Sequence, residues 1–527
     1  MKKFHPLRSI LVLALIAFMA TTQLMAQDAT DRWELQEDLW YELDLADAKT
    51  GWMHAQIFDD GKNFRTDVET KMKIARGPVQ LEITMKSSFT ETHDGVAVRM
   101  KYLQDMSTQV VETEWIFKDD KALMISSQGG RKKTKTFPMP EGDWLTPMAL
   151  DRFIAAQIEA GKTSIKYSML SPEEGIKPIH VTMQYVGDDM YAIDELAYAV
   201  TVWESETSIL AVKSKELYDA EFNMLFSEVE FPFGKIATRL STREKVMGED
   251  QGQQVAQGGG AGGAGGGNVA PNGLPVNAPE LMIETFIKVS EPIKNPYDTT
   301  TASLRLRAKK GKLPELPSAG AQRAMDDPET GDVLLTIDIN DNLPASGEDI
   351  ANPDYLDPST MIDGSDPYVR KLTKRAVKNA SDDKFERAEL MRKYVHGYIS
   401  NKGLATAFAS ASETARQRSG DCSEHGVLLA ALLRADGIPS RVATGLVYVD
   451  SFLGQENIFG WHMWTQALID DKWVDFDATL PNRYSSTHVL TATSSMADGE
   501  GSDQTQQLLL LLGNLEIEVE EVGYDQP

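Results

Sequence analysis

The chain has 527 residues, of which 42% are hydrophobic, and its formal net charge is −26 at pH 7. This length exceeds what one hydrophobic core normally supports. Domains of roughly 150 residues are typical, so the length predicts about three folded units. The acidic balance repels nucleic acid and anionic lipid, so nucleic acid is excluded as an expected partner. The single cysteine excludes a framework of disulfides.

Residues 1–26 have the features of a secretory signal peptide. Lys2, Lys3 and Arg8 make a basic start, and the apolar stretch that follows is too short for a stable membrane span. Cleavage is expected near Ala26, which removes these three cations and changes the formal net charge from −26 to −29. The sequence therefore predicts an exported protein, periplasmic or extracellular, with no stable membrane span after signal cleavage.

Residues 27–250 alternate between apolar and polar side chains over short segments. Leu81, Ile83 and Met85 show this period of two. The pattern predicts an antiparallel β-rich domain, with one helix over 150–160 lying on the sheet. No set of residues in this half has catalytic or metal-ligand spacing, and its single histidines are expected to be structural. Its expected partner is a component of the cell envelope.

A glycine-rich segment divides the chain. We predict a flexible linker over 251–275, because its composition loses too much backbone entropy to fold alone. Strand-like runs with many turn residues predict a small β module over 276–356. The acidic tail, 498–527, has two apolar runs around Gly513, which predict a terminal β-hairpin.

Residues 357–497 change to a helical period and then return to strands. Cys422 stands at the first turn of the most apolar predicted helix, where unpaired N–H groups and the helix dipole favour a thiolate. An exported protein usually keeps a lone thiol only for its chemistry. His462 begins one predicted strand and Asp477 follows another that runs antiparallel to it, so they can meet beside the thiol. This order predicts a Cys-His-Asp triad in which His462 moves the proton and Asp477 orients its ring.

Three motifs in this region resemble those of the transglutaminase-like family of papain-like cysteine enzymes. Gly-Asp-Cys at 420–422 resembles the cysteine box, His-Met-Trp at 462–464 the histidine box, and 473–479 the aspartate box. The resemblance implies that the catalytic acid is Asp477 rather than Asp475. It also implies an α+β fold in which the helix bearing the cysteine packs on an antiparallel sheet.

The resemblance covers roughly 368–481 and implies a reaction through a thioester intermediate. Members attack an amide carbonyl with the cysteine, release an amine, and pass the acyl group to water or to another amine. The chain is therefore expected to be an exported thiol-dependent acyltransferase or amidohydrolase acting on peptide or protein amide groups, with no cofactor and no metal. Two alternatives stay open: a cysteine protease of envelope proteins, and a catalytically silent binding scaffold.

Other polar residues near the motifs are weighed against structural roles. His425 is an alternative base, but His462 is preferred because an orienting acid follows it. Asp421 and Glu424 are expected to cap the helix. The backbone N–H of the cysteine is the expected first oxyanion donor, and Gln417 is a weak choice for the second.

Overall fold

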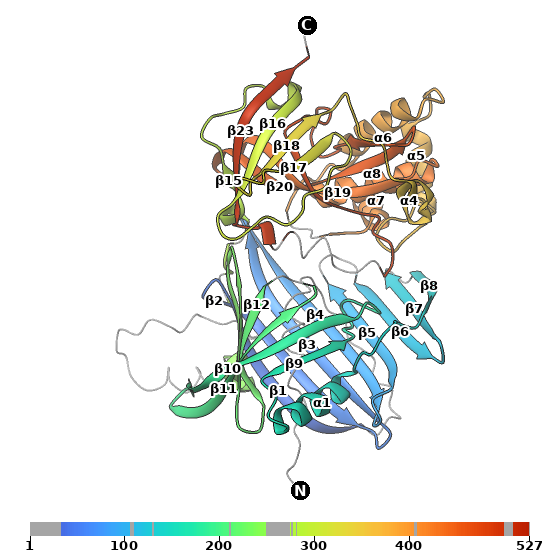
Figure 1. Ribbon diagram of the computed structural model, residues 1–527. Helices are drawn as coiled ribbons and strands as arrows, with labels where there is room; N and C mark the ends of the chain where they lie inside the picture. The colour runs from blue at the N-terminus through green and yellow to red at the C-terminus, as the bar shows by residue number, and fades with distance from the viewer. Residues whose placement is uncertain are drawn as a thin grey trace, which may run out of the picture.

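The computed structural model describes residues 33–105, 110–128, 131–209, 212–248, 274–275, 278–280, 282–404, 408–499, 508 and 510–525. The predicted signal peptide lies outside these residues, as does the predicted linker apart from 274–275. Within them the chain is α+β, as predicted, with three sheets whose neighbouring strands are antiparallel. In Figure 1 the C-terminal unit lies above the N-terminal β domain. No helix of the described part is long and apolar enough to cross a membrane.

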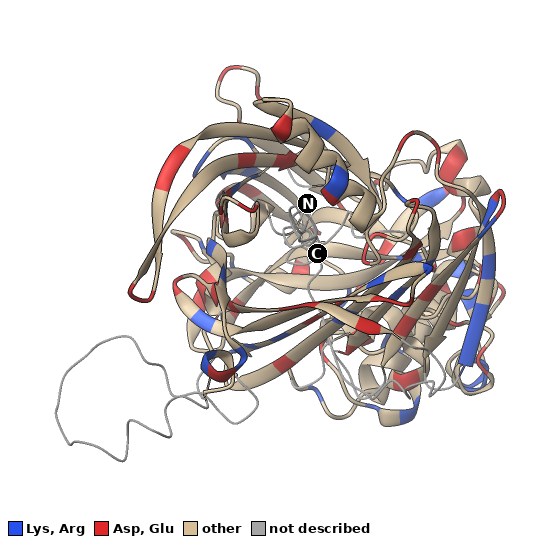
Figure 2. Ribbon diagram, turned by 90° about the horizontal axis from the view of Figure 1, so that it is seen from below, with Lys and Arg blue, Asp and Glu red and all other residues tan. Residues whose placement is uncertain are grey.

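The N-terminal domain is one sheet of fourteen strands, in the order β8-β7-β6-β5-β4-β3-β2-β1-β14-β13-β12-β11-β10-β9. Its first and last strands pair in the middle, with Trp40 opposite Ser241. The sheet curls strongly (Figures 1 and 2). The strands are β1 Glu34–Leu45, β2 Ala48–Asp59, β3 Asn63–Arg76, β4 Val79–Thr92, β5 Ala97–Asp105, β6 Val111–Lys118, β7 Lys121–Gln128, β8 Arg131–Pro138, β9 Ser164–Met169, β10 Ile179–Ile193, β11 Leu196–Thr207, β12 Lys213–Tyr218, β13 Met224–Phe231 and β14 Gly234–Ser241.

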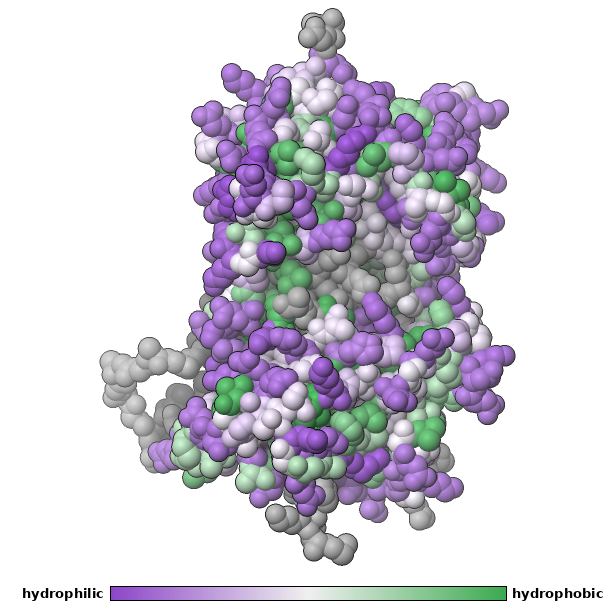
Figure 3. Space-filling model, viewed as in Figure 1, coloured by the Kyte–Doolittle hydropathy of each residue, from purple (hydrophilic) through white to green (hydrophobic). Residues whose placement is uncertain are grey.

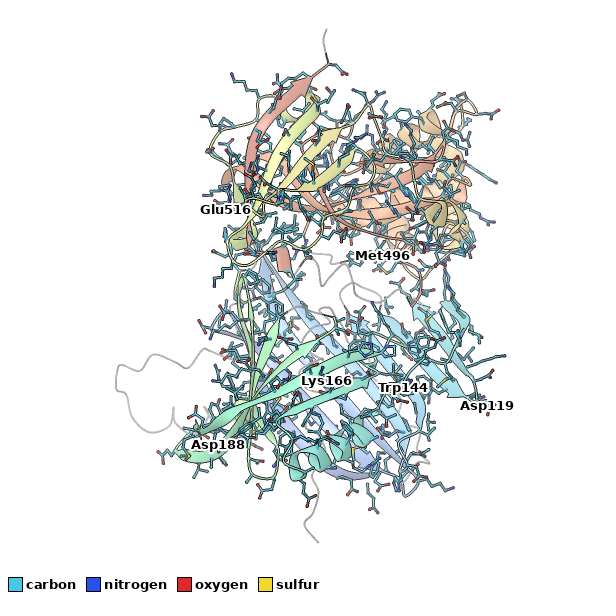
Figure 4. The ribbon with its side chains drawn as sticks, viewed as in Figure 1. Asp119, Trp144, Lys166, Asp188, Met496 and Glu516 are labelled. Atoms are coloured by element: carbon cyan, nitrogen blue, oxygen red, sulfur yellow. The ribbon has the colours of Figure 1, made fainter. Side chains whose placement is uncertain are left out.

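One helix and the curled sheet enclose an apolar core. Helix α1 (Pro147–Glu159) contributes Ile154, which is buried with Met53 and Met183 from opposite halves of the sheet. Alternation along the strands directs one set of side chains to this core, which is why the period of two was informative. A short helix, α2 (Arg243–Val246), follows the last strand. The β10–β11 hairpin, where Figure 4 labels Asp188, lies at the left of the domain.

The edge strand β8 carries Arg131, Lys132, Lys133 and Lys135, which Figure 2 shows as a run of blue. Charged residues on an edge strand oppose pairing with further strands. Hydrophilic residues cover most of the face drawn in Figure 3, with apolar side chains in small groups. The exposed edge is thus protected by charge.

The C-terminal unit combines two smaller sheets with a layer of helices. One sheet has the order β15-β20-β19-β22 with β21 beside β20, and the other has the order β17-β18-β16-β23. The strands are β15 Ile287–Lys288, β16 Thr299–Ala308, β17 Gln322–Asp326, β18 Val333–Asp338, β19 Ser440–Phe452, β20 Gln455–Ile469, β21 Lys472–Phe476, β22 His488–Ser494 and β23 Leu515–Tyr524. The helices are α4 Gly347–Ala351, α5 Pro367–Ala376, α6 Lys384–Tyr398, α7 Ala411–Gln417 and α8 Cys422–Ala435, with 3₁₀ turns at Ile283–Thr285, Pro296–Asp298 and Pro353–Tyr355.

The segment predicted as a small β module shares a core with the region that holds the three motifs. Leu304 and Leu335 are buried in the same apolar cluster as Leu446 and Phe459. Strand β15 also pairs with β20. The segment therefore packs as part of the C-terminal unit.

The prediction of a hairpin in the tail is wrong. The N–H of Leu512 donates to the carbonyl of Leu508 at 2.9 Å, which is a helical turn, and β23 pairs with the distant β16. Leu511 is buried in the core of the C-terminal unit, while Leu510 and Leu512 pack against the core of the β domain. A run of consecutive leucines does not by itself indicate a strand, because here successive leucines pack against two different cores.

Candidate active site

Cys422 is the first residue of α8, at the partly exposed end of a helix that is otherwise buried. The side chain of Asp421 accepts the N–H of Ser423 at 3.0 Å, and Glu424 returns a bond to the N–H of Asp421 at 2.8 Å. This capping box fixes the start of the helix. Gly420 has φ +147°, and a Cβ there would lie 2.3 Å from the Cβ of Glu424, so only glycine fits before the cap.

His462 and Asp477 meet through the pairing of β20 with β21, where Thr465 lies opposite Phe476. His462 Nε2 lies 2.9 Å from Asp477 Oδ2. His462 is 9% exposed and Asp477 is fully buried. Cys422 lies close enough to His462 to contribute to the raised pKa of its ring. The structure therefore brings the three predicted site residues together.

The charged forms of His462 and Asp477 stabilise each other. Burial acts to lower the pKa of His462, but the charge and hydrogen bond of Asp477, with those of Cys422, raise it to about 10. Burial acts to raise the pKa of Asp477, but His462 and then His488 hold it well below its ordinary value. At neutral pH the pair is thus an imidazolium and a carboxylate.

The alternative residues are engaged elsewhere. His425 Nδ1 lies 2.6 Å from the carbonyl of Asp421, and burial lowers its pKa to about 4, so it is a neutral ring bound to its own helix. Gln417 is exposed, and its amide donates to Glu413 Oε1 at 3.1 Å. Each of these side chains is thus hydrogen-bonded within its own helix or to that helix's cap.

Asp475, the other carboxylate of the aspartate box, is buried on the sheet. Its Oδ1 accepts from Trp464 Nε1 and from Gln466 Nε2, both at 2.8 Å. Burial raises its pKa. Asp475 therefore organises the aromatic core beside the site, while Asp477 is the carboxylate that reaches His462.

Arg392, which the sequence did not single out, holds the loop that carries Asp477. Its guanidinium is 2% exposed and binds both carboxylate oxygens of Glu389 at 2.7 and 3.0 Å. It also donates to the carbonyls of Asp477, Leu480 and Asn482 at 3.2, 3.3 and 2.9 Å. A glutamate and an arginine three residues apart on a helix normally indicate an exposed pair, so the sequence gave no sign of this clamp.

His488 is a second histidine on the same carboxylate and was also missed. Its Nε2 lies 3.2 Å from Asp477 Oδ2. The donor atoms of His462, Asp477 and His488 lie within 4.8 Å of one another, close enough to hold a metal ion. The spacing of these residues along the sequence does not reveal the cluster.

Arg76 brings a cation from the N-terminal domain to the same place. It ends β3, and its Nη2 lies 2.7 Å from Asp421 Oδ2. Burial acts to lower the pKa of Arg76, but the charges of Asp421 and Cys422 outweigh it and raise the pKa. A Cβ on the next residue, Gly77, would lie 2.7 Å from Leu453 Cδ1, so this turn also packs on the β19–β20 hairpin. The β domain thus contacts the residue that precedes Cys422.

A second contact between the domains is made by β8. Arg131 pairs with the buried Asp366, and Lys133 Nζ lies 3.5 Å from Asp363 Oδ2. Figure 4 labels Met496 on the side of the C-terminal unit that faces the β domain. A cavity of about 170 Å³ lies at this contact and is lined by Gln128, Arg131, Lys133, Thr360, Asp363, Ser410, Ser412 and Arg416.

Replacing Arg76 with alanine is expected to slow the alkylation of Cys422 at pH 6 by a few-fold, because a cation beside the thiolate is lost. A partly exposed ion pair contributes about 1 kcal/mol or less, which is a factor of roughly five. The rate is measured with iodoacetamide and mass spectrometry. Arg65→Ala, which breaks a pair with Asp67 on the same strand, is the matched control. Equal rates in Arg76→Ala and the parent would show that this cation does not act on the thiol.

The comparison with protein families agrees with this geometry. Residues 370–478 match the family model of the transglutaminase-like superfamily, and the matched segment contains Cys422, His462 and Asp477. The chain therefore contains a transglutaminase-like domain. No curated protein matches the chain significantly.

Three solved structures are similar to the chain at low identity. A proposed cysteine protease from Cytophaga hutchinsonii has 16% identity, covering 43% of this chain and 86% of its own, with a TM-score of 0.25. The periplasmic domain of TgpA from Pseudomonas aeruginosa, bound to ethylmercury, has 16% identity, covering 37% and 87%, with a TM-score of 0.22. A proposed protease from Parabacteroides distasonis has 11% identity, covering 76% and 68%, with a TM-score of 0.19. At these scores the class rests on the family model.

Proposed function

We propose that the protein is an exported thiol enzyme that transfers or hydrolyses acyl groups at amide bonds of peptides or proteins. One observation carries the proposal: the buried ion pair of His462 and Asp477 lies beside a partly exposed thiol at the start of α8. An imidazolium next to a cysteine stabilises the thiolate, which is the nucleophilic form.

In the proposed reaction the sulfur of Cys422 attacks an amide carbonyl carbon. The backbone N–H of Cys422 stabilises the oxyanion that forms. His462 gives its proton to the nitrogen, the C–N bond breaks, and the amine leaves a thioester behind. His462, now neutral, takes a proton from water or from a second amine, whose attack releases the acyl product and the thiolate. Asp477 keeps the ring of His462 oriented throughout.

The substrate and location follow from the same proposal. The signal-peptide pattern supports export to the periplasm or the extracellular space. A peptide or protein substrate fits a partly exposed thiol at a helix end. The β domain, which contributes Arg76 to this place, is the proposed contact with an envelope partner. Adding a primary amine to reactions with peptide amides would separate transfer to an amine from hydrolysis.

The first test is the pH dependence of alkylation of Cys422 by iodoacetamide in the folded protein. Because Asp477 and Cys422 raise the pKa of His462 to about 10, the thiol is expected to react rapidly at pH 6, well below the pH of about 8.5 near which a free cysteine loses its proton. In His462→Ala the alkylation of Cys422 is expected to be at least tenfold slower at pH 6. His425→Gln, a matched change on the helix, should keep the parent rate.

The opposite result has a definite meaning. If the thiol is inert, or reacts with an ordinary pH profile in both the parent and His462→Ala, the enzyme proposal is wrong. The chain would then be a binding scaffold that keeps the fold without the chemistry. Mass spectrometry reads the result without ambiguity because the chain has one cysteine.

A further inference from the structure

Both ring nitrogens of His488 face hydrogen-bond acceptors. His488 begins β22 and is fully buried. Its Nδ1 lies 3.0 Å from the carbonyl oxygen of Ser485, and its Nε2 lies 3.2 Å from Asp477 Oδ2. A carbonyl and an ionised carboxylate can only accept, so each nitrogen must donate a hydrogen.

A neutral ring does not satisfy this geometry. Either neutral tautomer would set the lone pair of one nitrogen against an oxygen lone pair, and a buried unsatisfied group is costly. The surroundings suit a cation: the ring centroid of Tyr484 lies 4.3 Å from that of His488, and the centroid of Trp464 lies 5.3 Å away. The face of an aromatic ring attracts a positive charge that lies over it within about 6 Å.

We propose that His488 is a positively charged positioning residue for the Cys422, His462 and Asp477 group, a role that rests on the proposed function. It holds Asp477 Oδ2 in the direction of His462, and its charge opposes the pull of that carboxylate on the proton of His462. The groups that act on His488 are Asp477, His462 at 5.8 Å between ring centroids, Tyr484, Trp464 and Asp475.

The sharing of Asp477 between His462 and His488 has a role in the proposed reaction. His462 must keep a proton while the thiolate waits and then give it to the leaving amine. A buried carboxylate with a single partner would bind that proton more tightly than transfer requires. By sharing Asp477, His488 makes His462 a better acid without removing the residue that orients it.

The protonation state is measured directly by NMR of the full chain labelled with ¹⁵N-histidine, at pH 7 with EDTA present. The signals of His488 are assigned by their loss in His488→Gln. Hydrogens on both ring nitrogens are the expected result. A signal from one bare nitrogen would overturn the proposal, and so would a nitrogen signal that changes when EDTA replaces Zn²⁺, since a bound metal would then occupy the cluster.

The effect on His462 is measured by its titration in His488→Gln, which keeps a side-chain donor toward Asp477 but removes the charge. The midpoint for His462 is expected to rise by one to two pH units, the size of an interaction between two unit charges about 6 Å apart in a protein interior. His180→Gln, in the β domain, should leave the midpoint unchanged. An unchanged midpoint in His488→Gln would overturn the proposal.

The orienting role is separated from the charge by comparing two variants. His488→Leu removes both donor and charge and is expected to slow alkylation of Cys422 at pH 6 by tenfold or more, whereas His488→Gln should restore most of the rate. Equal rates in both variants would contradict an orienting role. The titrations are repeated in a Cys422→Ser background, so that the proposal for His488 is tested independently of the thiol chemistry.

Discussion

Replacing Asp477 with alanine is expected to abolish the reactivity of Cys422 at pH 6 and to destabilise the C-terminal unit by about 3–5 kcal/mol. Asp477 accepts hydrogen bonds from His462, from His488 and from the N–H of Thr479, at 2.9, 3.2 and 2.7 Å. Its removal leaves two buried rings without their shared acceptor. Both rings would then lose their protons or the site would open, and the thiolate would lose its counterion in either case.

The measurement combines denaturant unfolding followed by tryptophan fluorescence with alkylation at pH 6. Asp477→Asn, which keeps the shape and one acceptor oxygen, is expected to be less destabilised but still slow to react. Asp450→Ala, an exposed carboxylate on β19, is the control and should change neither property. Rapid alkylation in Asp477→Ala would remove Asp477 from the proposed group.

Replacing Arg392 with leucine is the second change with a large expected effect, again about 3–5 kcal/mol of unfolding free energy. The change leaves the buried carboxylate of Glu389 with only Lys393 and Arg483, each 3.6 Å from its Oε1. It also removes the Arg392 donor from three carbonyls of the 477–482 loop. Because the loop also positions Asp477, the alkylation rate of Cys422 is expected to fall with stability.

A second variant separates charge burial from loop anchoring. The double variant Glu389→Leu with Arg392→Leu removes both members of the buried pair, so its destabilisation should be smaller than that of Arg392→Leu alone. Its alkylation rate should stay low, since the loop still lacks its donor. Lys384→Ala, at an exposed position on the same helix, is the control. A double variant no more stable than the single one would show that the carboxylate left without Arg392 is not the main cost.

The sequence predicted the parts of the site that local patterns encode. The apolar run after Cys422 marked a buried helix. The strand predicted from His462 onward and the strand before Asp477 marked a pairing that brings the two residues together. The residues that support them were not predictable in this way. His488 reaches Asp477 only through the order of strands in the sheet, and the burial of Arg392 depends on a loop far away in sequence.

The same limit applies to predicting the fold from local sequence patterns. The period of two in residues 81–85 correctly predicted a strand, now part of β4. No local pattern indicates that β1 pairs with β14, because pairing between distant strands depends on the whole sheet. The leucines near 510 failed as a strand for a related reason, since their apolar character served two cores at once.

The pairing of β1 with β14 also sets the order in which the β domain can form. Trp40 and Ser241 are partners although 201 positions separate them in the chain. A chain that emerges from its N-terminus must keep the free edge of β1 unpaired until nearly the whole domain has been made, and contacts of such long range form slowly. The β3–β4 turn and β8, which meet the transglutaminase-like domain, belong to the meander that is finished first. The surface that receives the transglutaminase-like domain is therefore assembled before the sheet that carries it is complete.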